Sequence, residues 1–341
     1  MNPTRLQHLL ENAAKCRLLV IGDVMLDEFV WGRVSRISPE APVPVVEVQS
    51  ETCYPGGAAN VARNLRAFCA GVQICGMLGD DPHAGRLRAL LEEERIFVDG
   101  MVVNPDFRTI VKTRIIARQQ QVVRVDRETR CLPSAAMTAR AVDQIGRLMA
   151  DHDGVILEDY GKGFVGQELK DAVSLMARDA GKFVAADPNP GNQLDWSGVD
   201  LLKPNRSEAF AMAGVADFGA SDDPRKDAAL NSVGALLLEK WGLPGVLITL
   251  GEHGMMLFER GAEPYHTPTR AREVFDVSGA GDTAIALFSL AVCAGATLRE
   301  AAEISNHASG VVVGKLGTAT LSAEELIESF LKDEERLGGK A

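Results

Sequence analysis

The sequence has few aromatic residues and no excess of positive charge, and it lacks long apolar runs. Aromatic residues make up 5% of the 341 residues, and 47 acidic side chains outnumber 36 basic ones, giving a net charge of −11. Such an acidic chain is poorly suited to bind nucleic acid or an anionic membrane without sequence specificity. The longest strongly apolar stretch, residues 284–296, is shorter than the ~18 residues that a membrane-spanning helix needs.

Signals for secretion, disulfides and transition metals are also missing. The first 16 residues contain polar and charged side chains throughout, so they do not form the apolar core of a secretory signal. None of the six cysteines forms a Cys-x-x-Cys pair, and the six histidines do not have the spacing of metal ligands. We therefore expect a cytoplasmic protein with reduced thiols and no dedicated transition-metal site.

Short apolar runs alternate with longer helical patterns along most of the chain. The apolar runs lie at residues 17–21, 72–78, 155–157, 183–186, 201–202 and 246–250, and the helical patterns at 58–68, 84–93, 135–149 and 228–241. Runs that are apolar on both faces and alternate with helices are typical of a parallel sheet covered on both sides. The pattern predicts an α/β fold without internal repeats.

Two regions depart from this alternation, and we expect them to form a small β lid. The first, between residues 28 and 55, has four prolines at positions 39, 42, 44 and 55 among short valine-rich pieces. The second, residues 111–127, alternates like a twisted β-ribbon. The alternation predicts that Lys112, Arg114 and Arg118 lie on one face, where they meet either solvent or an acidic ligand.

Residues 276–283, Asp-Val-Ser-Gly-Ala-Gly-Asp-Thr, are the best candidate for a reactive site. The small residues Gly279, Ala280 and Gly281 allow backbone N–H groups to point at an anion, and the helix predicted to follow adds its positive dipole end. Asp282 would repel a permanently bound pyrophosphate, but it suits a site where a hydroxyl loses its proton during phosphoryl transfer. We therefore favour a kinase-type anion hole with Asp282 as the catalytic base.

Two alternatives for this segment remain open at the level of the sequence. The same letters fit the dinucleotide fingerprint Gly-x-Gly-x-x-Ala, and they also fit an ordinary capped helix. A conventional P-loop is absent, because the nearest segment, residues 310–315, has one residue too few between its glycines. Phosphoryl transfer would therefore need another scaffold.

Three segments, in this order along the chain, together resemble a known family. Residues 55–62, Pro-Gly-Gly-Ala-Ala-Asn-Val-Ala, are similar to its N-terminal signature, residues 205–208, Asn-Arg-Ser-Glu, to its Asn-x-x-Glu element, and residues 276–283 to its C-terminal signature. On these motifs the chain resembles the ribokinase-like (PfkB) carbohydrate kinases. The resemblance implies a three-layer α/β fold with a mostly parallel central sheet, as one kinase domain over residues 1–341. Lid segments at about 28–55 and 108–128 would be inserted in it.

Within that family, residues 22–27, 31–32 and 38–44 resemble the members that phosphorylate D-glycero-D-manno-heptose 7-phosphate at the C1 hydroxyl. Those enzymes serve ADP-heptose and lipopolysaccharide core biosynthesis. Many are fused to a nucleotidyltransferase that carries a His-x-Gly-His motif. This sequence has no such motif, so the resemblance implies a stand-alone kinase. A kinase for ribose or fructose, a NAD-dependent oxidoreductase and a non-catalytic sugar-binding regulator remain alternatives.

The predicted sugar site combines acidic strand ends with glycine-rich backbone. Carboxylates accept hydrogen bonds from sugar hydroxyls, and glycines let the backbone approach a ligand closely. The candidate sugar-binding residues are Asp23, Asp27, Gly56, Gly57, Asn60 and Asp187. A sugar phosphate also needs cations for its far end, for which we consider Lys162, Arg124, Arg114 and Arg118.

The predicted nucleotide and metal ligands come from the second half of the chain. ATP as co-substrate would contact Asn205, Glu208, Thr249, Gly251 and Gly254, and the resemblance implies Mg²⁺ held by Glu208 and Asp187 through water. Val277 replaces the threonine that is usual in the family, so a requirement for a monovalent cation stays open. The resemblance also implies a homodimer that pairs through the β lid.

Overall fold

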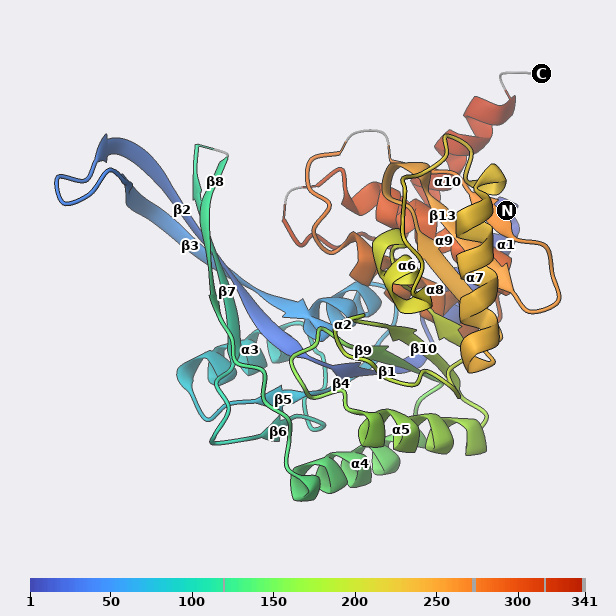
Figure 1. Ribbon diagram of the computed structural model, residues 1–341, viewed down its shortest axis with the longest axis horizontal. Coiled ribbons are helices and arrows are strands. Elements are labelled where there is room, and N and C mark those ends of the chain that lie inside the picture. The colour runs from blue at the N-terminus through green and yellow to red at the C-terminus, as the bar shows by residue number, and fades with distance from the viewer. Residues whose placement is uncertain (119, 272–273, 316, 339–341) are drawn as a thin grey trace.

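The computed structural model describes residues 1–118, 120–271, 274–315 and 317–338 (Figure 1). Its centre is an eight-stranded sheet with the order β14-β13-β12-β11-β10-β9-β1-β4. The strands are β1 (Arg17–Gly22), β4 (Gly71–Cys75), β9 (Gly154–Glu158), β10 (Phe183–Asp187), β11 (Leu201–Leu202), β12 (Gly245–Thr249), β13 (Met255–Glu259) and β14 (Tyr265–Thr267). All neighbours pair in parallel from β4 to β12, and β13 and β14 add an antiparallel edge.

Helices cover both faces of this sheet (Figure 1). One buried cluster joins the sheet to α1 (Pro3–Ala13), α2 (Ala58–Arg66), α3 (Pro82–Glu93), α8 (Ala280–Cys293), α9 (Leu298–Val312) and α10 (Ala323–Gly338). The other joins it to α4 (Ala135–Met149), α5 (Gln167–Asp179), α6 (Arg206–Ala213) and α7 (Ala228–Trp241). Successive residues of β1 alternate between the two clusters, because side chains of a strand point to opposite faces. The predicted three-layer α/β fold is confirmed.

The apolar run at residues 72–78 does not form the single strand that we expected. It divides into β4 and β5 (Met77–Leu78), and β5 pairs with β6 (Val102–Val103) in a separate two-stranded sheet. Gly76 lies at the division, where a Cβ would come within 2.8 Å of the Gly22 carbonyl oxygen. The chain therefore leaves the main sheet at a glycine, which has no Cβ and so permits this close approach.

The predicted β lid is confirmed and projects from the body (Figure 1). Its strands are β2 (Val24–Ile37), β3 (Pro44–Gly57), β7 (Ile110–Ala117) and β8 (Gln120–Arg127), in the order β3-β2-β7-β8. The expectation that Arg118 shares a face with Lys112 and Arg114 is wrong. Arg118 follows the end of β7 with φ +50°, which removes it from the alternation of the strand. Gln119, within the predicted lid segment, lies outside the described residues.

Two sequence expectations concern membranes and thiols. In the described ranges, no helix is both long and apolar enough to cross a bilayer. All six cysteines are free thiols. Location in the cytoplasm and the single-domain boundary at residues 1–341 stay predictions.

Candidate active site

The carboxyl ends of the central strands bring the candidate residues to one edge of the sheet. Gly22, Glu158 and Asp187 are register neighbours at the ends of β1, β9 and β10. Asp23 follows β1, and Lys203 follows β11. Ligands of open α/β sheets bind at this edge.

Asp282 is the third residue of α8, and both of its carboxylate oxygens accept hydrogen bonds. The Asn60 amide donates to Oδ2 at 2.7 Å, and the Tyr160 hydroxyl donates to Oδ1 at 2.7 Å. Burial raises the pKa of Asp282 above its ordinary value, whereas these two donors and the charge of Lys203 act in the opposite direction. The carboxylate is thus fixed in place beside the first turn of a helix.

The backbone in front of Asp282 has the shape of an anion cradle. Gly279 caps α8 with φ +81°, and a Cβ there would lie 2.8 Å from the Asn60 amide nitrogen. Ala280 and Gly281 begin α8, so their N–H groups have no partners within the helix, although the Ala280 N–H donates to the Val277 carbonyl oxygen at 3.3 Å. The helix begins earlier than the apolar run at 284 suggested, so the cradle belongs to the helix end itself.

Three carboxyl groups and one lysine form a cluster next to the cradle, in which Glu158 and Lys203 are buried and Asp187 and Asp282 are half-buried. Single carboxylate oxygens of Glu158, Asp187 and Asp282 lie within 4.8 Å of one another. Glu158 is fully buried, and neither of its oxygens has a hydrogen-bond partner in the described part of the chain. Lys203 is 3% exposed and its Nζ lies 2.8 Å from Asp187 Oδ2.

The charged groups of this cluster change one another's pKa. Burial, together with the neighbouring carboxylates of Asp187 and Asp282, raises the pKa of Glu158 well above its ordinary value. Burial also raises the pKa of Asp187, although Lys203 opposes that change. For Lys203 burial acts to lower the pKa, but the combined attraction of Asp187, Glu158 and Glu208 outweighs it and the pKa is raised. Lys203 is therefore a cation held next to the anion cradle.

Asp23 is used by the protein backbone. Its carboxylate accepts hydrogen bonds from the N–H groups of Tyr160 at 3.0 Å, Lys162 at 2.9 Å and Phe164 at 3.1 Å. Asp23 therefore fixes the loop that follows β9, which carries both Tyr160 and Lys162. Contact between Asp23 and a sugar stays a prediction.

Asp27 lies at the base of the lid, next to the predicted glycines. It forms an ion pair with Arg114 of β7. A Cβ at Gly56 would come within 2.1 Å of Asp27 Oδ2, and Gly57 has φ +60° where β3 meets α2. These glycines are needed for the packing of strand, helix and carboxylate at this point.

Two further basic candidates, Lys162 and Arg124, have a carboxylate partner. Lys162 Nζ lies 2.7 Å from Glu128 Oε2, directly after β8, and so connects the body to the lid. Arg124 is exposed and donates two hydrogen bonds to Asp126, at 2.9 Å and 3.0 Å. Lys162, Arg124 and Arg114 therefore lie around the lid, each paired with an acidic side chain.

A cavity of about 430 Å³ adjoins the cradle and contains three of the five predicted nucleotide ligands. It is lined by Thr249, Gly251, Glu252, Gly254, Met255, Thr269, Ala271, Val274, Val277, Ala280, Gly281, Asn306, Ser309, Gly310 and Val313. Asn205 and Glu208 are not lining residues. They form a reciprocal capping box at the start of α6, and Asn205 pairs with Thr249 as an isolated β-bridge. The capping box uses only one oxygen of Glu208, Oε2.

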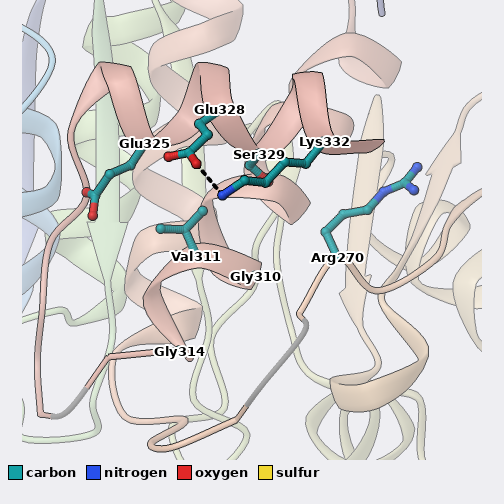
Figure 2. Close-up of a pocket in the computed structure, with 8 residues that line it drawn as sticks. All are labelled: Arg270, Gly310, Val311, Gly314, Glu325, Glu328, Ser329 and Lys332. Atoms are coloured by element: carbon teal, nitrogen blue, oxygen red, sulfur yellow. Dashed lines mark ion pairs between the residues drawn. The ribbon is translucent and has the colours of Figure 1, made fainter. Parts of the chain in front are cut away.

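A second cavity, of about 350 Å³, lies against α9 and α10 (Figure 2) and contains no predicted site residue. Figure 2 shows Lys332 directed at Glu328, with which it forms an ion pair. Arg270 pairs with Asp333. Gly310 lines both cavities. The lysine and the arginine of this cavity are thus both neutralised within the protein.

Three residues at the site were missed by sequence reasoning: Tyr160, Glu158 and Lys203. Tyr160 stands in the segment Asp-Tyr-Gly-Lys-Gly, of which only the lysine was considered. Lys203 follows a buried strand and precedes proline, so a charge at a strand end was the available signal. Nothing in the sequence pattern distinguished Glu158 from other strand-end acids.

Comparison with known proteins now decides the family. The model of the pfkB family carbohydrate kinases matches residues 15–326. The chain belongs to this family. Family membership rules out the dinucleotide interpretation of residues 276–283. The structure agrees, because the nearest preceding strand, β14, ends at Thr267 and does not lead directly into α8.

Similarity to curated relatives extends over nearly the whole chain. The chain is 41% identical over 327 residues to the bifunctional protein HldE of Citrifermentans bemidjiense, covering 96% of this chain and 66% of the relative. It is 43% identical to bifunctional protein HldE of Caulobacter vibrioides, covering 94% of this chain and 65% of the relative. The chain spans about two thirds of the length of these curated relatives.

Solved structures establish the fold by shape alone. Arabidopsis thaliana ribokinase complexed with ribose and ATP has a TM-score of 0.68 at 19% identity, covering 92% of this chain and 98% of that one. Phosphofructokinase-2 from Escherichia coli in complex with potassium has a TM-score of 0.72 at 17% identity, covering 93% and 99%. The fold of this carbohydrate kinase is therefore ribokinase-like.

Proposed function

We propose that this pfkB kinase transfers the terminal phosphoryl group of ATP to the C1 hydroxyl of D-glycero-D-manno-heptose 7-phosphate. The observation that carries the proposal is the position of Asp282. Its carboxylate lies in the first turn of α8, whose first two residues line the cavity of about 430 Å³. The hydrogen bond from Asn60 connects it to α2, which directly follows lid strand β3. The proposed base, the proposed anion cradle and the cavity therefore lie next to one another, which supports the proposal.

Asp282 would accept the proton of the C1 hydroxyl while the C1 oxygen attacks the terminal phosphorus of ATP and ADP leaves. The backbone N–H groups of Gly279, Ala280 and Gly281 would stabilise the negative charge that builds on the transferred group. An anomeric hydroxyl is more acidic than an ordinary alcohol, so a carboxylate is an adequate base. Thr249, Gly251 and Gly254 would contact the nucleotide.

Magnesium suits the carboxylates of Asp187, at the end of β10, and Glu208, in the first turn of α6. The negative charges of Asp187 and Glu208 both raise the pKa of Lys203. Glu208 has one carboxylate oxygen that its capping box does not use. Hard divalent cations prefer such oxygen ligands and often keep water between themselves and the protein. Asp187 and Glu208 would therefore hold Mg²⁺ through water, and the ion would neutralise phosphate charge. Dependence on a monovalent cation remains open, since Val277 has no hydroxyl.

The choice of a sugar phosphate rests on the sequence resemblance and on the lid. Residues 22–27, 31–32 and 38–44 resemble heptose 7-phosphate kinases, and the HldE relatives match nearly the whole chain. Lys162 and Arg124 are paired with Glu128 and Asp126, and a phosphate would replace those carboxylates as their partner. A ribose or fructose kinase, which needs no such cations, is the alternative. Ribokinase with ribose and ATP shares this fold.

The lid also supports the proposal of a homodimer. Every residue of β8 is exposed, and Val122, Val123 and Val125 on this edge strand are 39%, 45% and 40% exposed. An open edge strand with apolar side chains is a ready surface for pairing. We propose that a second copy of this chain pairs with this lid.

An ADP-release assay over several sugars tests the function. Wild type, Asp282→Asn and the surface control Asp143→Asn would be assayed with heptose 7-phosphate, ribose and fructose, with Mg²⁺ and with a chelator. We expect turnover of the heptose phosphate only, loss of activity on chelation, and a rate about 10²–10⁴-fold lower for Asp282→Asn. Asp143→Asn should behave like wild type, since Asp143 pairs with Arg147 on the surface of α4, away from the cavity.

Each part of the proposal has its own contradicting result. If ribose or fructose reacts and the heptose phosphate is inert, the substrate is wrong. If Asp282→Asn keeps near-normal turnover, the assigned base is wrong. If sugar phosphate binds without release of ADP, the protein is a binding regulator.

A further inference from the structure

Tyr160 and Asn60 bind different carboxylate oxygens of the proposed base, Asp282. Its hydroxyl donates to Asp282 Oδ1, while Asn60 donates to Oδ2. One donor alone leaves a carboxylate free to turn about its Cβ–Cγ bond, whereas two donors on different oxygens fix its plane. Each oxygen keeps a second lone pair after accepting one hydrogen bond.

The placement of Tyr160 depends on Asp23. The Tyr160 N–H donates to Asp23 Oδ2 at 3.0 Å, and Asp23 is 3% exposed. The same carboxylate accepts from the backbone of Lys162 and Phe164. The loop after β9 is therefore held by a buried anion, and its tyrosine is aimed at Asp282.

We propose that Tyr160 is a positioning residue for phosphoryl transfer: its hydroxyl holds Asp282 Oδ1 so that the base presents a fixed oxygen to the acceptor hydroxyl. This inference rests on the proposed function. Tyr160 keeps its own proton throughout, and the proton of the acceptor goes to Asp282. Burial and the charge of Asp282 raise the pKa of Tyr160 well above its ordinary value, which agrees with a phenol that stays protonated.

The test compares Tyr160→Phe with Tyr265→Phe. The Tyr265 hydroxyl also donates to a carboxylate, Glu303 Oε1 at 2.5 Å, but it belongs to β14 and α9 and does not line the nucleotide cavity. Both variants remove one phenol–carboxylate hydrogen bond and keep the ring. With the acceptor that wild type phosphorylates, we expect kcat to fall about ten- to a hundredfold in Tyr160→Phe, with KM for ATP unchanged. Tyr265→Phe should keep the wild-type kcat.

A double variant separates positioning from a general structural effect. If Tyr160 acts through Asp282, adding Tyr160→Phe to Asp282→Asn should cause little further loss of kcat. A wild-type kcat in Tyr160→Phe, or losses that multiply in the double variant, would overturn the inference. These results leave the proposed function intact, which fails if Asp282→Asn itself is active, if the heptose phosphate is inert, or if no ADP is released. Thermal unfolding of each variant would show that the fold is retained.

Discussion

Replacing Gly279 with alanine should damage catalysis through Asn60. A Cβ at this position would lie 2.8 Å from the Asn60 amide nitrogen, closer than van der Waals contact allows. Asn60 is 1% exposed, and its amide must shift to make room for the new Cβ. The amide then loses its 2.7 Å hydrogen bond to Asp282 Oδ2.

Two separate costs follow from the structure. The backbone φ of +81° disfavours any L-residue with a Cβ, at about 1–2 kcal/mol of stability. A hydrogen bond to a charged group is worth about 1.5–3 kcal/mol, which corresponds to about a ten- to hundredfold loss of kcat if it is needed in the transition state. Gly279→Ala should therefore lose both stability and turnover.

Gly181→Ala separates these costs. Gly181 has φ +64°, but a Cβ there meets nothing within 4 Å. Thermal melts should show a similar decrease of a few degrees for both variants. ADP-release kinetics should show a reduced kcat only for Gly279→Ala. Equal kcat values in the two variants, at equal loss of stability, would refute the reasoning that Asn60 links the cradle to the base.

Three further predictions concern the lid, the assembly and acid stability. Gly56→Ala should raise KM for the sugar and not for ATP, because the new Cβ displaces the Asp27 carboxylate at the lid base. Val123→Asp should convert a dimer to monomers in sedimentation experiments, since it adds charge to the exposed lid edge. Burial lowers the pKa of His307 to about 3, so the unfolded chain takes up a proton below pH 6.5 that the folded chain refuses. Urea unfolding at pH 5 should thus show about 2 kcal/mol less stability than at pH 7 from this group, and His307→Gln should remove that loss.

Each of these has a matched control. Gly85→Ala, where a Cβ meets nothing within 4 Å, should leave both KM values unchanged. Leu175→Asp replaces an apolar side chain that is 49% exposed on α5 and should not alter the assembly. His8→Gln, at an exposed position on α1, should keep the wild-type loss between pH 7 and pH 5. A sugar KM raised in both glycine variants, a wild-type monomer, or equal acid loss in His307→Gln would contradict the respective prediction.

The sequence by itself determined the layered α/β fold and the lid, and it predicted an anion cradle at residues 276–283. These features follow from local patterns. Alternating apolar runs specify strands and helices, and small residues before a helix specify an anion-binding turn. The glycines at 56, 57 and 279 were also recognisable, since close approach or a positive φ requires them. The roles of the site residues remain predictions.

Only the tertiary structure decided which side chains meet. Tyr160 and Asn60 reach Asp282 from 122 and 222 residues away along the chain, and Lys203 reaches Asp187 from the neighbouring strand end. Strand order in the sheet places these residues together, and a periodic pattern carries no information about strand order. For the same reason the sequence indicated a sugar ligand at Asp23, whereas folding directs that carboxylate to three backbone N–H groups. A buried charge takes the donors that the fold brings to it.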